Sequence, residues 1–255
     1  MAFLYAAKVS ARIVSRKDVL PGADAGLAMR LPPNVEGTGA QRRLLTTAVE
    51  LFAARGYHGV SVRDIVGAMG LKPSSLYAHY GSKEELYSTL VVIANTEILR
   101  VMSKAHEDTA TAPANEQLTA LIRTYVEFHT DYPLLSMIGH NDLHVLSGAD
   151  LETVTALRRD ASNLLRSVIE RGNGSGLFAC PHPWIAVAAM AAMGIRLASW
   201  YRPPGHPADP QAPTDKFLVQ VQDGWAMPQY DMETINVAFA DFALSMVHYA
   251  PSDAQ

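Results

Sequence analysis

The segment from Ser61 to Tyr80 limits the possible folds more than any other part of the chain. Its first half has apolar residues at the spacing i, i+3, i+4 and i+7, which gives a short helix one apolar face. Those residues are Val62, Ile65, Val66 and Met69. Gly70 then allows the positive φ that ends a helix, and Pro73 suits the first turn of a second helix. The pattern predicts two short helices joined by a tight turn, which is the layout of a helix-turn-helix.

The second helix is expected from Lys72 to Tyr80 and has one aliphatic core candidate, Leu76. Its other side chains are small or can form hydrogen bonds, so they suit base edges and phosphates. We expect Ser61 to cap the first helix and Leu71 to be buried as a plug in the turn. Because an ordinary helical hairpin can show this pattern by chance, the flanking sequence has to decide between the two interpretations.

Both flanks predict further helices. Thr38 and Gln41 have the spacing of a capping box, and they open a helix that stops at Gly56. Its apolar stripe consists of Leu44, Leu45, Ala48, Leu51 and Phe52. Ser82 and Glu85 repeat the capping box and open a long apolar helix. The motif therefore lies within a three-helix unit that leads directly into a fourth helix, which argues against a chance hairpin.

Residues 48–87 resemble the N-terminal DNA-binding domain of the TetR family of bacterial transcriptional regulators. Their sequence is AVELFAARGYHGVSVRDIVGAMGLKPSSLYAHYGSKEELY, and the likeness rests on the blocks LFAARGY, VRDI, SLYAHY and SKEEL. The resemblance implies that this domain binds double-stranded DNA. The residues expected to make the contact are Arg42, Arg63, Lys72, Pro73, Ser74, Ser75, Tyr77, Ala78, His79 and Lys83.

Some of these residues are expected at the DNA backbone. The resemblance implies that Arg63 and Lys83 lie where family members typically touch phosphates, close to the starts of two helices. Tyr77 and His79 are expected to contact backbone oxygens. For Tyr77 the alternative is a core aromatic that leaves only its hydroxyl at the surface.

The residues nearest the base edges are expected to be 72–75 and Ala78. Serine and alanine discriminate weakly between bases, since neither makes the bidentate hydrogen bonds available to arginine or asparagine. Lys72 is therefore the best candidate for a guanine contact, and Ala78 for packing against a thymine methyl group.

Charge is distributed unevenly along the chain. The whole protein has 21 Lys and Arg against 25 Asp and Glu, a net charge of −4, so it is not a general polyanion binder. Residues 38–83 contain six basic and two acidic side chains, net +4, which leaves −8 for the rest. The positive charge is thus concentrated where DNA is expected to bind.

The remainder of the chain predicts an all-α fold, with an N-terminal helix-turn-helix domain and a larger C-terminal helical domain for effector binding and dimerisation. We expect a flexible N-terminal extension over 1–37, the DNA-binding domain over 38–98 and the C-terminal domain over 99–255. The alternative for the extension is a basic arm that reaches a minor groove through Lys8, Arg12, Arg16 and Lys17. Apolar periodicity predicts C-terminal helices over 114–130, 134–146, 151–171, 183–201 and 232–249, and a polar connector over 106–117. Residues 205–230 form a proline-rich insertion in which the run KFLVQVQ could make a short hairpin.

The last two helices exceed what a small domain needs to cover itself. Together with the family resemblance they imply a homodimer in which the 183–201 and 232–249 helices of each subunit form a four-helix interface. Family members usually carry an effector pocket in the C-terminal domain. Candidates for its lining are Tyr125, Phe128, His129, Met137, His140, His144, Met190, Met193 and Trp200, although methionine and aromatic residues at helical spacing also fill ordinary cores.

His140 and His144 are four residues apart and could share one helix face, as two metal ligands would. No third ligand accompanies them, so packing or hydrogen bonding is the favoured interpretation and no metal or other cofactor is expected. Gly176 and Phe178, together with the Trp200 to Pro203 segment, are similar to a TetR subgroup that controls lipid or steroid catabolism and senses acyl-CoA thioesters. The insertion departs from that pattern and puts the ligand class in doubt.

The expected function is a DNA-binding repressor that a small hydrophobic or acyl-CoA-type effector releases from a palindromic operator. Alternatives are a DNA-binding regulator controlled by a protein partner instead of a ligand, and an all-α enzyme. The sequence has no nucleophile-elbow motif or P-loop, which disfavours the enzyme. It also shows no signal peptide and no apolar stretch long enough to span a membrane, so a cytoplasmic protein is expected.

Overall fold

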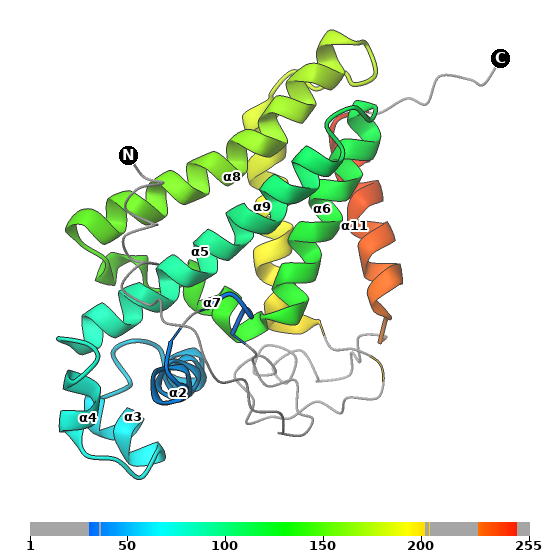
Figure 1. Ribbon diagram of the computed structural model, residues 1–255. Helices are drawn as coiled ribbons and strands as arrows, with labels where there is room; N and C mark the ends of the chain where they lie inside the picture. Colours follow the sequence, from blue (N-terminus) through cyan, green and yellow to red (C-terminus); the bar gives the residue numbers. More distant parts are fainter. Residues whose placement is uncertain (1–30, 36, 202–203, 205–228, 249–255) are drawn as a thin grey trace. The chain divides into compact units, whose positions relative to one another are not determined.

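The computed structural model describes residues 31–35, 37–201, 204 and 229–248, and every regular element within them is a helix (Figure 1). The elements are α2 (Gly39–Arg55), α3 (Val62–Ala68), α4 (Pro73–Tyr77), α5 (Lys83–Asp108), α6 (Ala114–Asp131), α7 (Pro133–His140), the 3-10 helix η1 (Leu143–Val145), α8 (Gly148–Gly174), α9 (Pro183–Trp200) and α11 (Met232–Met246). The all-α class is therefore confirmed. Residues 1–30 of the predicted extension and 205–228 of the insertion, with the suggested hairpin, lie outside the described residues.

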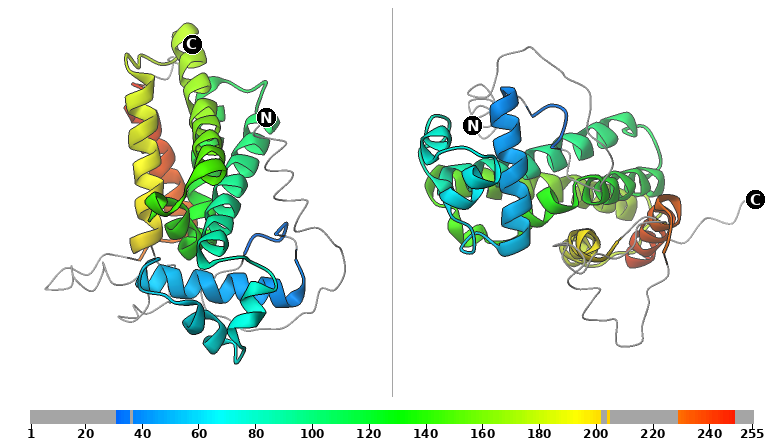
Figure 2. Two further views of the ribbon diagram at one scale, coloured as in Figure 1. Left: turned by 90° about the vertical axis from the view of Figure 1, so that its left-hand side faces the viewer. Right: turned by 90° about the horizontal axis from the view of Figure 1, so that it is seen from below.

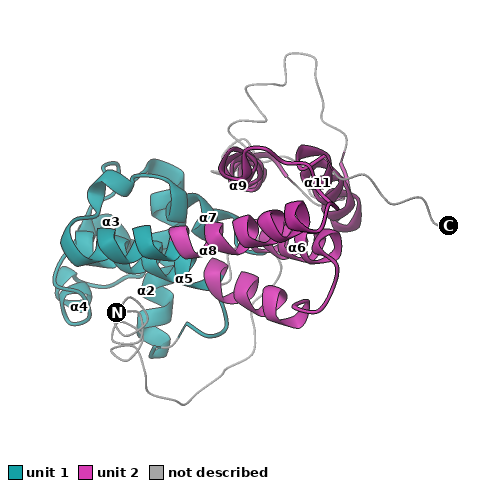
Figure 3. Cartoon of the chain, turned by 90° about the horizontal axis from the view of Figure 1, so that it is seen from above, with its two compact units in different colours: residues 1–97, 131–157 teal, residues 98–130, 158–255 magenta. Residues whose placement is uncertain are grey.

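The chain divides into two compact units (Figure 3). Unit 1 contains residues 1–97 and 131–157, and unit 2 contains residues 98–130 and 158–255. Residues 131–157, which the sequence assigned to the C-terminal domain, belong to unit 1 in this division. The functional domain boundaries stay a prediction.

In unit 1, the predicted helix caps form at α2 and α3, and the one at α5 forms in part. Thr38 and Gln41 make a capping box at the start of α2, and Ser61 and Asp64 make another at the start of α3. At α5 the box is only half formed: the Ser82 hydroxyl accepts from the Glu85 amide at 3.0 Å, while the Glu85 carboxylate accepts from Gly81 at 2.7 Å. Local sequence thus sets where these three helices begin.

Helix α2 packs against α3 and α7, and α3 packs against α4 (Figures 1 and 2). Gly56 ends α2 with a φ of 69°, and Gly70 lies in the turn between α3 and α4 with a φ of 68°. Both values favour glycine. The buried stripe of α2 differs slightly from the expected one, because Val49 is buried while Leu51 is only half-buried. These contacts fix the α3–α4 hairpin on the α2 scaffold.

The predicted helix over 134–146 is wrong in its second half. Helix α7 ends at His140, and Asp142 adopts a left-handed conformation with φ of 45°, which breaks the helix before η1. Tertiary contacts hold this break. The Asp142 carboxylate accepts from the Tyr57 amide at 3.1 Å, and the Tyr87 hydroxyl donates to the Asn141 carbonyl at 3.2 Å.

In unit 2, α6 and α9 approach closely at one small residue. A Cβ added at Gly194 would lie 2.2 Å from Cε1 of Tyr125, so only glycine fits there. The Tyr125 hydroxyl also donates to the Ala191 carbonyl at 3.2 Å. Helix α11 packs against α9 and is tied to α6 by an ion pair between Arg123 and Glu233. Small residues in α9 therefore allow close packing within the subunit itself.

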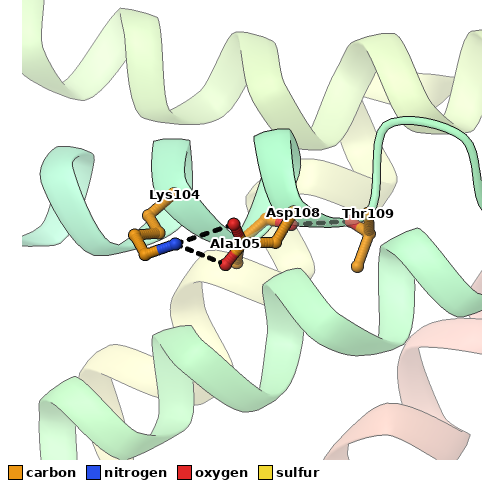
Figure 4. A network of polar contacts seen from close by, with 4 residues as sticks. All are labelled: Lys104, Ala105, Asp108 and Thr109. Atoms are coloured by element: carbon orange, nitrogen blue, oxygen red, sulfur yellow. Dashed lines mark hydrogen bonds and ion pairs between the residues drawn. The ribbon is translucent and has the colours of Figure 1, made fainter.

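The end of α5 lies later than the sequence suggested. The expected polar connector over 106–117 shrinks to residues 109–113, since α5 continues to Asp108 and α6 begins at Ala114. Lys104 donates to both Asp108 oxygens at 2.7 and 2.8 Å, and the Thr109 hydroxyl donates to the Ala105 carbonyl at 2.6 Å (Figure 4). Each contact joins two residues one helical turn apart, and together they satisfy polar groups in the last turns of α5.

Helix α9 is the one helix of the described residues with the length and composition of a membrane span. It has 18 residues with a mean hydropathy of 1.2, and 33% of it is buried inside the protein. It contains Arg196, its Gly194 packs against Tyr125 of α6, and it also packs against α11. Its apolar character therefore has a packing explanation.

Candidate nucleic-acid interface

The short helix α4 presents nearly all its side chains to solvent. Its single core residue is Leu76, which is fully buried, while Lys72 occupies the N-cap and Pro73 the first position. Lys72, Pro73, Ser74, Tyr77, Ala78 and His79 are exposed, and Ser75 is half-buried. The helix is shorter than expected. The His79 amide donates to the carbonyl three residues back, at Leu76 (2.9 Å), and this 3-10-type turn interrupts the α-helical pattern after Tyr77.

The two tyrosines of this segment have opposite environments. Tyr77 is 56% exposed, which excludes the alternative of a core aromatic. Tyr80 is buried, and this desolvation raises its pKa to about 12. The outer face of α4 thus carries one large aromatic side chain whose hydroxyl can donate or accept.

Leu71 is not the buried plug that the sequence predicted for the turn. Its side chain is 40% exposed. Its amide closes the turn by donating to the Val66 carbonyl at 2.8 Å, beside a 3.0 Å bond from Gly70 to Gly67. The backbone of Leu71 therefore stabilises the end of α3 while its side chain remains exposed.

Lys83 holds the loop between α2 and α3. Its ammonium donates to the carbonyls of Tyr57 at 2.9 Å and Val60 at 2.8 Å, and lies 3.9 Å from the centre of the Tyr57 ring. Desolvation lowers the pKa of Lys83. The sequence pattern suggested a phosphate contact here, and it gave no sign of this structural contact inside unit 1.

The two candidate arginines, Arg42 and Arg63, differ in the contacts that their guanidinium groups make. Arg42 donates to the carbonyls of Leu31 at 3.1 Å and Val35 at 2.5 Å, so it binds the segment that precedes α2. Arg63 is exposed, and within the part of the chain that the structure describes it has no hydrogen bond or ion pair. Of the pair, only Arg63 is available to an outside anion without breaking existing contacts.

The candidate effector residues fall into both units. Tyr125, Phe128, His129, Met190, Met193 and Trp200 belong to unit 2, and Met137, His140 and His144 belong to unit 1. In unit 2 the rings of Tyr125 and His129 lie 4.3 Å apart, and Nδ1 of His129 is 2.7 Å from the Tyr125 carbonyl. Full burial lowers the pKa of His129 to about 4, so its imidazole is neutral near pH 7.

His140 and His144 do not share a helix face, because α7 ends between them; that expectation was wrong. His144 is exposed in η1 and faces His58 of the α2–α3 loop, with the two Nε2 atoms 3.4 Å apart. The two residues are 86 positions apart, so no sequence spacing could have indicated the pair.

Comparison with known proteins defines the class to which this fold and interface belong. The model of bacterial regulatory proteins of the tetR family matches residues 44–90, and the tetracyclin repressor-like C-terminal domain matches residues 111–219. The two models together cover more than half of the chain. This protein belongs to the TetR family, and it is a DNA-binding transcriptional repressor.

One curated relative is the HTH-type transcriptional repressor KstR2 of Rhodococcus jostii, 27% identical over 209 residues, which are 77% of this chain and 98% of that protein. Among solved structures, a tetR-family regulatory protein from Rhodococcus RHA1 has a TM-score of 0.70 at 24% identity, covering 84% of this chain and 99% of that one. AibR, solved with isovaleryl coenzyme A and operator DNA, has a TM-score of 0.62 at 18% identity, covering 83% and 100%. Proteins of this family are typically not enzymes.

Proposed function

We propose that the chain acts as a homodimer that grips a palindromic operator through α4 and leaves it when a small hydrophobic or acyl-CoA-type molecule binds the C-terminal domain. The observation that carries the DNA-binding part is the outer face of α4, where polar and aromatic side chains are exposed around a single buried anchor, Leu76. A helix with so little core of its own is suited to enter a major groove.

Within that interface, Lys72 reads a base and Tyr77 and His79 meet the DNA backbone. Lys72 stands at the exposed N-cap of α4, where its ammonium can reach an outside acceptor. Arg63, exposed near the start of α3, contacts a phosphate. Arg42 and Lys83 would need to exchange their carbonyl partners for DNA, so their contribution is to hold the scaffold.

The homodimer is supported by the apolar surface of two helices that pack on each other in unit 2. Ile185 of α9 is 67% exposed and Phe242 of α11 is 52% exposed. Trp184 and Val237 are exposed on the same two helices. An isologous contact between two such surfaces would bury them and space two copies of α4 for successive major grooves, about 34 Å apart.

Effector release is the finer part of the proposal. AibR was solved with isovaleryl coenzyme A, and KstR2 is named as a repressor. The Tyr125 and His129 pair, with its neutral imidazole, offers aromatic and polar surface inside unit 2 where such a molecule could be sensed. A DNA-binding role also implies that the protein works in the cytoplasm.

Operator binding is tested by selecting bound fragments from the source genome and titrating the best one against a scrambled duplex. The expected result is a preference for a palindrome, relaxed by Lys72→Ala and weakened by Arg63→Ala, with a smaller salt dependence in the arginine variant. Equal affinity of the wild-type protein for palindrome and scrambled DNA would refute sequence-specific binding.

The effector is sought by a thermal-shift screen of acyl-CoAs and hydrophobic metabolites, followed by release of the operator fragment. A compound that stabilises the protein and releases DNA supports the sensor. If no compound does both, while a protein from the same cells releases the operator, control by a partner replaces control by a ligand.

A further inference from the structure

We propose that His58 and His144 form a binding site for a divalent transition-metal ion, with Zn²⁺ as the best match. The two imidazoles come from different elements of unit 1, the α2–α3 loop and η1. Both are exposed, and their Nε2 atoms are 3.4 Å apart. Imidazole nitrogen is a preferred ligand of zinc, copper and nickel.

The separation of the two nitrogens fits a shared ion. At a Zn–N bond length of 2.0–2.1 Å, two corners of a tetrahedron are roughly 3.3–3.4 Å apart. A hydrogen bond between two ring nitrogens would favour a shorter distance of about 2.9–3.0 Å. The ring centres are 5.7 Å apart, farther than the nitrogens, so the rings converge at their Nε2 ends.

Both histidines are held by contacts of their own backbone neighbours. On the His58 side, Lys83 binds the carbonyls of Tyr57 and Val60, and Asp142 accepts from the Tyr57 amide. On the His144 side, the amide of Val145 donates to the Asp142 carbonyl at 3.0 Å. Two ligands on fixed backbones lose little freedom on binding, which favours affinity.

The charges around the pair are mixed. Burial is the main cause that raises the pKa values of Tyr87 and Tyr57, and the negative charges of Asp142 and Glu84 add to it, so both carboxylates lie near this region. Lys83 adds one positive charge. Across the described ranges no group of three or more His, Cys, Asp or Glu is placed to hold one ion. The site therefore offers two protein ligands, and water fills the other positions, as exposure of both imidazoles permits.

The site goes beyond regulation by an organic effector, because an ion held there would join the loop that precedes α3 to η1 within one unit. It would add a fixed contact next to the helix-turn-helix without touching α4. Since the unprotonated imidazole is the ligand, acid should release the ion.

The test titrates ZnCl₂ into the full-length protein, freed of metal with a chelator, and follows binding by calorimetry. We expect one Zn²⁺ per chain, a loss of affinity of at least about tenfold in both His58→Ala and His144→Ala, and no loss in His182→Ala, an exposed histidine in unit 2.

Melting curves in chelator show whether the variants fold like the wild type. Zn²⁺ should raise the melting temperature of the wild type and of His182→Ala, but not of the alanine variants at positions 58 and 144. The proposal is overturned if the wild-type protein binds no Zn²⁺, if either alanine variant at positions 58 and 144 binds as the wild type does, or if His182→Ala loses affinity equally. None of these readouts requires DNA or an effector, so a failure here is distinct from a failure of the proposed operator binding.

Discussion

Lys83 shows how one residue can have a structural task where its sequence context suggests a DNA contact. We expect Lys83→Met, which keeps the alkyl chain and removes the charge, to lower the free energy of unfolding by about 1–3 kcal/mol, because two carbonyls lose a charged donor. Urea unfolding measures this. If Lys83 served only as a phosphate contact, the variant would bind all duplexes more weakly with unchanged stability.

Gly194 is set by the ring packed against it. Gly194→Ala places a methyl group 2.2 Å from the Tyr125 ring, so we expect a loss of about 1–3 kcal/mol through overpacking. Gly174→Ala is the matched control, since nothing lies within 4 Å of a Cβ at that helical position. Chemical denaturation of both variants should show a lower free energy of unfolding for Gly194→Ala only. Equal stability of the two variants would contradict the packing argument.

His129 makes stability depend on pH. Its pKa is about 4 in the folded protein against 6.5 for the free side chain, so the unfolded chain takes up the proton first as the pH falls. Stability is present above pH 6.5 and is lost towards pH 4, by up to about 3 kcal/mol. His129→Asn keeps a donor for the Tyr125 carbonyl and does not titrate. Melting temperatures from pH 7 to pH 4.5 should therefore fall less in the variant, and an identical fall would exclude His129 as the cause.

Among single residues, sequence reasoning succeeded where the signal was local. The Ser61 cap, the positive φ of Gly70 and the buried Leu76 each depend on a few neighbouring residues. It failed for Leu71 and gave no hint of the His58 and His144 pair, because these depend on how the turn is oriented and on contacts between distant segments.

At the scale of elements, the start of α3 has a matched test. Ser61→Ala removes the acceptor for the Asp64 amide, and we expect it to cost about 1 kcal/mol and to weaken operator binding as α3 frays. Ser61→Thr keeps the hydroxyl and should behave like the wild type. Thermal unfolding and duplex titration give the two readouts, and a harmless alanine would mean that packing alone fixes this helix.

The break between α7 and η1 shows the limit of periodicity. The apolar pattern over 134–146 continues across Asn141 and Asp142, yet the helix ends because the groups of this break bond to Tyr57 and Tyr87. Tertiary contacts therefore overrode a helical pattern. The ends of α5 and α8 differ in the other direction, because both helices extend beyond the predicted boundaries, to Asp108 and Gly174.

At the scale of the whole molecule, the proposed dimer depends on the exposed apolar side chains of α9 and α11. Phe242→Glu should give a monomer by analytical ultracentrifugation and abolish tight operator binding, because burying the carboxylate in the interface is costly. Leu151→Glu is the control, an exposed leucine of α8 in unit 1. A dimer that survives Phe242→Glu, or dissociates equally with Leu151→Glu, would exclude this surface.

The fold class and the helix-turn-helix could be predicted because both rest on short-range patterns repeated along the chain. The effector class could not, since Tyr125, His129 and Met190 look the same in sequence whether they line a pocket or fill a core. Operator preference is equally hidden, because Ser74, Ser75 and Ala78 are residue types that discriminate weakly between bases.

The hydrogen bonds from Arg42 to the residues that precede α2 determine where the protein can be shortened. Leu31 and Val35 are buried, and their carbonyls are acceptors for that guanidinium. A shortened protein for crystallisation or for a reporter fusion should therefore begin upstream of Leu31. A cut at Gly37 would remove these carbonyl acceptors of the Arg42 guanidinium and expose the apolar surface that Leu31 and Val35 cover, so the shortened protein should aggregate more readily.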